Sequence, residues 1–262
     1  MNNSNMYDLF SENYDRFVNW DERLSSEIPF LVSEIAHLEP KDGEKISILD
    51  AACGTGQHAI ALQDQGFDCA GADFSSEMVR IAKQNAKKSK YEIPFIQAGF
   101  GEYSNAFGKN AFDGLVCLGN SLPHVLDEYG LANTFTDFKA IMRKGGKLII
   151  QNRNFDKVVA ERLRFMTPQT FRKDDGTWIF ARFYDFTPDG RLTFNVQILT
   201  SREGEDFQQQ VVRTRLWPMG KDLLCEFLKQ AGYINLKLYG DLEGSDFDID
   251  ESPNLVITAR LG

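Results

Sequence analysis

Residues 46–62, ISILDAACGTGQHAIAL, place a strand pattern, a small-residue loop and a helix pattern in succession. The apolar residues 46–49 predict a buried strand, and residues 57–65 predict the helix. In this arrangement the backbone of the loop approaches a ligand closely, and the helix N-terminus faces that ligand. The run therefore predicts a binding site at the carboxyl end of the strand.

Two kinds of cofactor are compatible with this loop. The run Gly54-Thr-Gly56-Gln-His-Ala59 satisfies the G-x-G-x-x-A form of dinucleotide-binding enzymes. Asp50, four residues before Gly54, would repel a pyrophosphate but suits a ligand with ammonium and sulfonium charges. We therefore favour S-adenosylmethionine over NAD, and a nicotinamide-dependent oxidoreductase remains the alternative.

Asp73 is a second acidic residue near the loop. It lies 23 residues after Asp50, close to the end of the next predicted strand. At this position an acidic side chain accepts hydrogen bonds from ribose hydroxyls. Either aspartate alone is also typical of a surface or helix-capping residue. The two acids on both sides of one glycine loop favour the binding interpretation.

The segments around this loop alternate between strands and helices, which indicates βαβ units. We predict an α/β fold with a doubly wound, mostly parallel seven-stranded sheet. The predicted strands cover residues 46–49, 67–71, 93–97, 112–117, 147–151, 234–240 and 254–260. The other predicted helices cover residues 76–88, 131–142 and 221–231.

Residues 159–217 depart from this alternation. The segments TWIFARFYDF, RLTFNVQILTS and FQQQVVRTRLW alternate apolar and polar residues between turn signals at 188–190 and 202–205. This pattern predicts an antiparallel β insertion, which we interpret as a cap over the substrate. The cofactor-binding domain would then comprise residues 41–158 and 218–262.

Residues 1–40 precede the main fold and predict one or two helices. Tyr7, Phe10, Tyr14 and Phe17 recur at helical spacing, and a second apolar group follows at 28–35. Taken alone, this spacing is typical of the apolar face of an ordinary amphipathic helix.

Composition restricts partners and location. The chain has 38 acidic and 29 basic residues and a net charge of -9, which disfavours nucleic acid and anionic membranes. We expect no metal, because the three histidines form no ligand motif. Widely spaced cysteines and the lack of an apolar leader or span predict a cytoplasmic protein with reduced thiols. The oligomeric state stays open. The four cysteines are Cys53, Cys69, Cys117 and Cys225.

These residues resemble the motifs of the class I S-adenosylmethionine-dependent methyltransferases. The run from Asp50 to Gly56 is similar to their first motif, with Ala52 where glycine is usual, and Asp73-Phe-Ser is similar to the second. The resemblance implies that Met78 covers the adenine. Phe100 would stack on the adenine in place of the aspartate that many members carry.

Two further segments resemble the glycine and sarcosine N-methyltransferase group. Residues 118–124, LGNSLPH, are similar to its G-N-S-x-x-H segment, and residues 152–156, NRNFD, to its R-N-Y-D segment. The group also closes aromatic and arginine residues over the cofactor, so the resemblance implies a helical lid at 1–40. The cofactor-binding residues it implies are Tyr14, Trp20, Arg23, Asp50, Ala51, Ala52, Gly54, Gly56, Asp73, Phe74, Met78, Phe100 and Leu118.

The same resemblance implies that Asn120 and Arg153 hold an amino-acid substrate, with Arg153 on its carboxylate. Arg153 suits a bidentate grip, although an ion pair at a strand end is the alternative. Asn120 could orient an amine or form an ordinary turn. His124 is a candidate general base, but we favour a packing role.

Methyl transfer is an in-line displacement, so the protein mainly aligns a nucleophile with the methyl group. We predict a methyltransferase for a small-molecule acceptor, preferably the amine nitrogen of a glycine- or sarcosine-like amino acid. An oxygen or carbon acceptor, or a protein that binds the cofactor without catalysis, remains an alternative.

Overall fold

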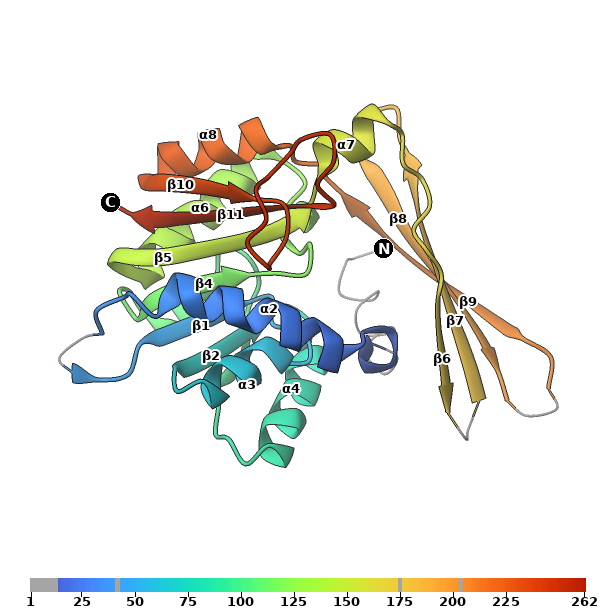
Figure 1. Cartoon of the computed structure of the whole chain (residues 1–262), viewed down its shortest axis with the longest axis horizontal. Helices are drawn as coiled ribbons and strands as arrows, with labels where there is room; N and C mark the ends of the chain where they lie inside the picture. Colours follow the sequence, from blue (N-terminus) through green and yellow to red (C-terminus); the bar gives the residue numbers. More distant parts are fainter. Residues whose placement is uncertain (1–13, 41–42, 174–175, 203–204) are drawn as a thin grey trace.

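A computed structural model describes residues 14–40, 43–173, 176–202 and 205–262. Its centre is a seven-stranded sheet of order β10-β11-β5-β4-β1-β2-β3, in which only β11 runs antiparallel to its neighbours (Figure 1). The predicted doubly wound, mostly parallel sheet is confirmed. Its strands are β1 Ser47–Ala51, β2 Asp68–Asp73, β3 Phe95–Gln97, β4 Phe112–Cys117, β5 Met142–Arg153, β10 Tyr233–Tyr239 and β11 Asn254–Leu261.

Helices cover both faces of this sheet. Successive strand residues face opposite ways, so Ile48 packs with α2, α3 and α4, whereas Leu49 packs with α6 and α8. Burial on both faces explains the apolar residues of central strands such as β4 and β5, whereas most residues of the edge strand β10 are exposed or half-buried. In the described part of the chain no helix is long and apolar enough to cross a membrane. The helices are α2 Trp20–Ile35, α3 Gln57–Asp64, α4 Ser76–Lys88, α5 Tyr103–Phe107, α6 Glu128–Ile141, α7 Phe155–Ala160 and α8 Lys221–Ala231, with a 3₁₀ turn η2 at Leu122–His124.

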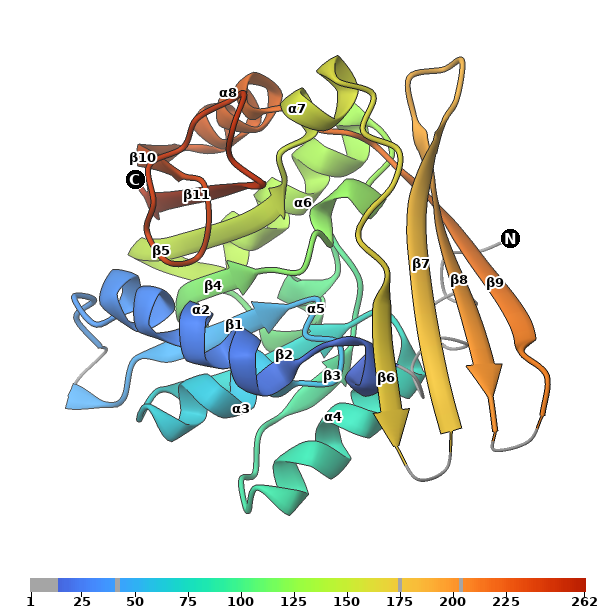
Figure 2. The ribbon, with the colours of Figure 1, turned by 45° about the vertical axis from the view of Figure 1, so that its right-hand side comes forward.

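Residues 169–216 form a separate antiparallel sheet of order β6-β7-β8-β9. Figure 2 shows it standing beside the α/β body. One face buries Phe180, Val196 and Val212. Val196 and Val212 are cross-strand neighbours, and Phe180 lies diagonally opposite Val196. The strands are β6 Gln169–Lys173, β7 Gly176–Phe186, β8 Leu192–Ser201 and β9 Gln208–Leu216.

Several local features differ from the sequence prediction. Helix α6 begins three residues earlier than predicted, because Asp127 caps it by accepting from the backbone N–H of Gly130 at 2.7 Å. Helices α5 and α7 and strand β6 were not predicted, since each has only five or six residues. At the N-terminus, Tyr7 and Phe10 lie outside the described residues, as does part of the turn signal at 202–205.

Gly56 allows the start of α3 to pack closely against β3 and α4. Its φ is +80°, and a Cβ there would lie 2.8 Å from Cζ of Phe95 and 2.9 Å from Cβ of Ala82. Gly71 on β2 leaves room for the same ring, because its Cβ would lie 2.5 Å from Phe95. The loop thus needs glycine at position 56 for packing as well as for backbone conformation.

We expect Gly56→Ala to lower the free energy of unfolding by about 2 to 4 kcal/mol, through left-handed strain plus overpacking. Urea denaturation of the purified variant measures the change. Gly190→Ala is the matched control, because Gly190 has φ +74° with nothing within 4 Å of its Cβ position. The control should lose only about 1 kcal/mol, and equal losses in both variants would disprove the packing role.

Candidate active site

One cavity of about 770 Å³ lies between the seven-stranded sheet and the four-stranded sheet. Its wall includes residues at the carboxyl ends of β2 and β5, the loops after β1, β3 and β4, and side chains of β7, β8 and β9. Ligands of open α/β sheets bind at this edge, where loops from neighbouring parallel strands converge. The cavity is therefore the candidate active site.

Most of the predicted site residues meet at this cavity. Its wall contains Tyr14, Arg23, Ala52, Gly54, Asp73, Phe74, Met78, Phe100, Asn120, His124 and Arg153. The predicted residues outside the wall are Trp20, Asp50, Ala51, Gly56 and Leu118. Of these, Ala51 and Leu118 belong to the hydrophobic cores, and Gly56 contacts Phe95 as described above.

The first loop keeps a glycine-like backbone at Ala52. Its φ is +73°, and the backbone N–H groups of Ala52 and Cys53 both donate to the carbonyl of Ala72 at 2.8 Å. A non-glycine residue in this region costs about 1 to 2 kcal/mol, which explains why the resembling family favours glycine there. Ala52 therefore adopts the left-handed backbone conformation that glycine adopts at lower cost.

Asp73 links the first and second loops. Its Oδ2 accepts from the backbone N–H of Gly54 at 2.9 Å, and its Oδ1 accepts from the N–H of Ser75 at 2.9 Å. These bonds set the orientation of a buried carboxylate at the cavity wall. Each carboxylate oxygen can accept a further hydrogen bond, so Asp73 is able to organise the loop and to accept from a ligand.

Asp50 is a buried carboxylate with one oxygen unsatisfied. Its side chain is 3% exposed, and Oδ2 has no hydrogen-bond partner in the described structure. Burial, reinforced by the negative charge of Asp73, raises the pKa of Asp50 to about 7. A cation bound in the adjacent cavity would stabilise the ionised form. The site therefore fits a ligand with ammonium and sulfonium groups.

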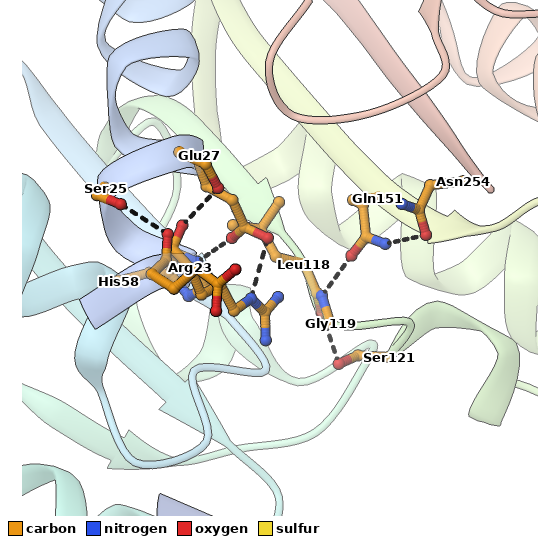
Figure 3. A network of polar contacts seen from close by, with 11 residues as sticks. Arg23, Ser25, Glu27, His58, Leu118, Gly119, Ser121, Gln151 and Asn254 are labelled. Carbon is orange, nitrogen blue, oxygen red and sulfur yellow. Dashed lines mark hydrogen bonds and ion pairs between the residues drawn. The ribbon is translucent and has the colours of Figure 1, made fainter. Parts of the chain in front are cut away.

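An ion-pair network holds Arg23 at the cavity wall. Arg23 Nε donates to Glu27 Oε1 at 3.0 Å, and Glu27 Oε2 lies 2.6 Å from His58 Nε2 (Figure 3). His58 thus connects α3 to α2. The hydroxyl of Thr55 in the glycine loop donates to Asp15 at 2.7 Å, which fastens the first described residues to the loop.

Gln151 and Asn120 fasten the loop after β4 to the end of β5. Gln151 accepts from the N–H of Gly119 at 2.8 Å and donates to Asn254 at 3.1 Å (Figure 3). Asn120 has φ +62°, and its Oδ1 accepts from the backbone N–H of Arg153 at 2.9 Å. The turn role of Asn120 is therefore present in the structure, and it positions Asn120 at the cavity.

Arg153 reaches the cavity without an acidic partner. Its Nε is buried and has no hydrogen bond, and none of the ion pairs between described residues includes it. Arg153 is only partly buried, but a solvent-shielded Nε without a hydrogen-bond partner costs free energy. The geometry favours a ligand role over the strand-end ion pair.

His124 lies where η2 meets β9. Its Nδ1 is 3.4 Å from the hydroxyl of Thr214, and the backbone N–H of Trp217 donates to the carbonyl of Pro123 at 2.8 Å. Burial lowers the pKa of His124 to about 4, so its imidazole is neutral at pH 7. The described residues contain no group of three or more side chains suited to hold a metal ion.

The sequence reasoning missed Arg182, which lines the same cavity from β7. A signal for it exists. Residues 178, 180, 182, 184 and 186 share one face of this strand, and Arg182 is the charged residue among Trp178, Phe180, Tyr184 and Phe186. A charge at an inward position of an alternating strand is a marker for a site.

The chain is similar to known methyltransferases in sequence and in structure. A family profile described as a methyltransferase domain matches residues 48–146. The glycine/sarcosine N-methyltransferase of Aphanothece halophytica is 27% identical over 89% of this chain and 82% of that protein. The glycine/sarcosine N-methyltransferase of Halorhodospira halochloris is 27% identical over 93% of this chain and 84% of that protein. An S-adenosylmethionine-dependent methyltransferase structure from Clostridium acetobutylicum ATCC 824 has a TM-score of 0.78 at 16% identity, covering 98% of this chain and 99% of that one.

The sheet order, the acid-flanked glycine loop and the matched domain give the class of this protein: it is an S-adenosylmethionine-dependent methyltransferase. Within the class, its sequence is similar over most of its length to glycine/sarcosine N-methyltransferases. The resemblance inferred from the motifs is confirmed. The nicotinamide-dependent alternative is not retained.

The raised pKa of Asp50 predicts a pH dependence. Because this pKa of about 7 exceeds that of an unfolded aspartate, the ligand-free protein should lose stability as pH rises from about 4 to about 7. A cationic ligand needs the ionised form, so S-adenosylmethionine should bind more tightly at about pH 7.5 than at about pH 5.5. Calorimetric titration at both values measures this difference.

Asp50→Asn is the matched variant for this test. It should bind more weakly and show a flatter pH profile over the same interval, because the amide does not titrate. A variant whose affinity follows the same pH curve as the unchanged protein would assign the titration to another group.

Proposed function

We propose that the chain transfers a methyl group to the amine nitrogen of a small amino-acid-like acceptor whose carboxylate binds Arg153. One observation carries this proposal: the guanidinium of Arg153 lines the same cavity as Gly54 and Asp73 and has a buried Nε without a partner. Its planar fork matches a carboxylate. The names of the relatives in Aphanothece halophytica and Halorhodospira halochloris support an amino-acid acceptor.

We assign the cofactor half to the loops after β1, β2 and β3. Asp50 and the loop around Gly54 serve the methionine portion, Asp73 the ribose, and Met78 and Phe100 the adenine. The unsatisfied oxygen of Asp50 and the cavity positions of the other four support this assignment. The bound cofactor supplies an electrophilic methyl group on its sulfonium.

The protein's part in the chemistry is alignment and exclusion of water. The acceptor nitrogen needs an unshared pair, so the amine has to be neutral when it reacts. A buried His124 with a pKa of about 4 is too weak a base to deprotonate an ammonium group near pH 7. We therefore assign His124 to packing between η2 and β9, and Asn120 to positioning the segment that carries Arg153.

Two segments close the cavity in this proposal. Residues 1–40 act as a lid, and residues 159–217 act as a cap that contributes to acceptor choice. Phe17 packs against Phe180 of β7 with ring centroids 5.4 Å apart, and Asp15 bonds to Thr55 of the glycine loop. The described part of the lid therefore contacts both the cofactor loop and the cap. The four free cysteines agree with a reducing compartment, and we propose the cytoplasm.

The acceptor proposal is tested by detecting methylated product and S-adenosylhomocysteine with glycine, sarcosine, β-alanine and ethanolamine as acceptors. Amines with a carboxylate should react, and ethanolamine should be poor because it offers Arg153 no anion. Rates should also rise with pH as more amine is neutral. Turnover confined to hydroxyl or carbon acceptors would contradict the proposal.

Arg153→Lys should raise KM for a reactive amino acid by about tenfold to a hundredfold, because lysine does not reproduce the planar fork. Affinity for S-adenosylhomocysteine should stay unchanged. Arg80→Lys is the control, since Arg80 is an exposed residue of α4 paired with Glu77. An unchanged KM in a folded Arg153→Lys protein would return Arg153 to a structural role.

A further inference from the structure

The cap carries a second arginine at the cavity. On β7, Arg182 lies on the same face as the buried residues Phe180 and Tyr184, and its cross-strand neighbour on β8 is Val196. Val196, Tyr184 and Arg182 all belong to the cavity wall. A positive charge thus stands in an otherwise apolar and aromatic surface.

Arg182 has no acidic partner among the described residues. Its Nε is buried and has no hydrogen bond, and its guanidinium carbon lies 4.7 Å from the ring centroid of Phe17. Two other arginines on or beside this sheet are paired: Arg164 with Asp185, and Arg215 with Asp189. Unlike these two arginines, Arg182 at the cavity has no ion pair among the described residues.

Arg153 faces the same cavity and also has an unpartnered Nε. Burial and the nearby charge of Arg153 lower the pKa of Arg182, although a guanidinium remains charged in proteins. Two partly buried like charges destabilise the fold unless an anion offsets them. The protein provides no such anion in the described structure, so the ligand is the remaining source.

We propose that Arg153 and Arg182 form a dianion-binding pair, and that the acceptor is an amine with two negative charges. One is a carboxylate on Arg153, and the other is a second acidic group on Arg182. This inference rests on the proposed amine methyltransferase function. It differs from that function by assigning the cap arginine to acceptor choice and by favouring acceptors larger and more acidic than glycine.

The cavity has room for such an acceptor. Its volume of about 770 Å³ lies in the upper part of the range of about 300 to 1,000 Å³ for small-molecule sites. Val196 is the cross-strand neighbour of Arg182, and Phe194 and Leu216 add further apolar side chains to the cavity wall. These residues favour a short carbon chain between the amine and the second acid, because they offer that chain apolar contacts.

The first test measures binding, independently of turnover. Acetate, malonate, succinate and inorganic phosphate are titrated against the S-adenosylhomocysteine-bound protein by calorimetry. A dianion should bind at least about tenfold more tightly than acetate, and Arg182→Gln should remove that advantage. Malonate or succinate binding without phosphate binding would identify a second carboxylate, and the reverse would identify a phosphate group.

The second test compares acceptors. We expect kcat/KM for aspartate or glutamate to exceed that for glycine by about tenfold or more. Arg182→Gln should lower it about tenfold to a hundredfold for the dianionic acceptor, mainly through KM, and about threefold or less for glycine. Arg182→Lys keeps a positive charge, so its kcat/KM for the dianionic acceptor should lie between the values of the unchanged protein and of Arg182→Gln. Arg164→Gln is the control, because Arg164 lies at the exposed side of the cap.

Equal losses for glycine and for dianionic acceptors in Arg182→Gln would overturn the inference, and Arg182 would then act only through its contact with Phe17. Absence of any dianion preference in the binding test would overturn it as well. Failure of the proposed function gives a different result: no amine would be methylated, while the dianion titration could still show the two-arginine site. If Arg182→Gln fails to fold, Arg182→Lys and Arg182→Met replace it in both tests.

Discussion

The hydrogen bond from the Gly54 backbone to the Asp73 carboxylate is the interaction on which the site depends. It joins the loop after β1 to the end of β2, and the second oxygen of Asp73 holds the turn that starts α4 through Ser75. One buried side chain thereby sets the relative position of two loops at the edge of a parallel sheet. Asp50 is buried close to the same loop, and its burial, together with the negative charge of Asp73, raises the pKa of Asp50 to about 7. A positively charged sulfonium ligand would stabilise the ionised form of these carboxylates.

Two positively charged side chains also lie on the cavity wall. Arg153 at the end of β5 and Arg182 on the cap have unpartnered guanidinium nitrogens, and both side chains line the wall. In the proposed function, Asp50 and Asp73 serve the cationic cofactor, whereas Arg153 and Arg182 serve an anionic acceptor. Opposed charges of this kind orient two ligands relative to each other before any reaction takes place.

Much of the α/β body was predictable because its signals are local. Small residues after an apolar strand, an acid before the loop and alternating strand and helix patterns each lie within a few residues of one another. Short elements such as α5 and α7 were missed because a single turn has too few residues to show a period. The start of α6 was predicted late because its cap, Asp127, precedes the apolar positions that mark the helix.

The sequence by itself was sufficient to predict the fold class, to favour S-adenosylmethionine over NAD, and to name most of the predicted residues that line the cavity, because consecutive strand ends encode them. Only the tertiary structure decided that Asp73 also binds the Gly54 backbone, that Gly56 serves packing against Phe95, and that Arg182 shares a cavity with Arg153. These facts depend on contacts between segments far apart in the chain. Residues 153 and 182 belong to different sheets, and no local sequence pattern predicts that the two sheets contribute to one cavity.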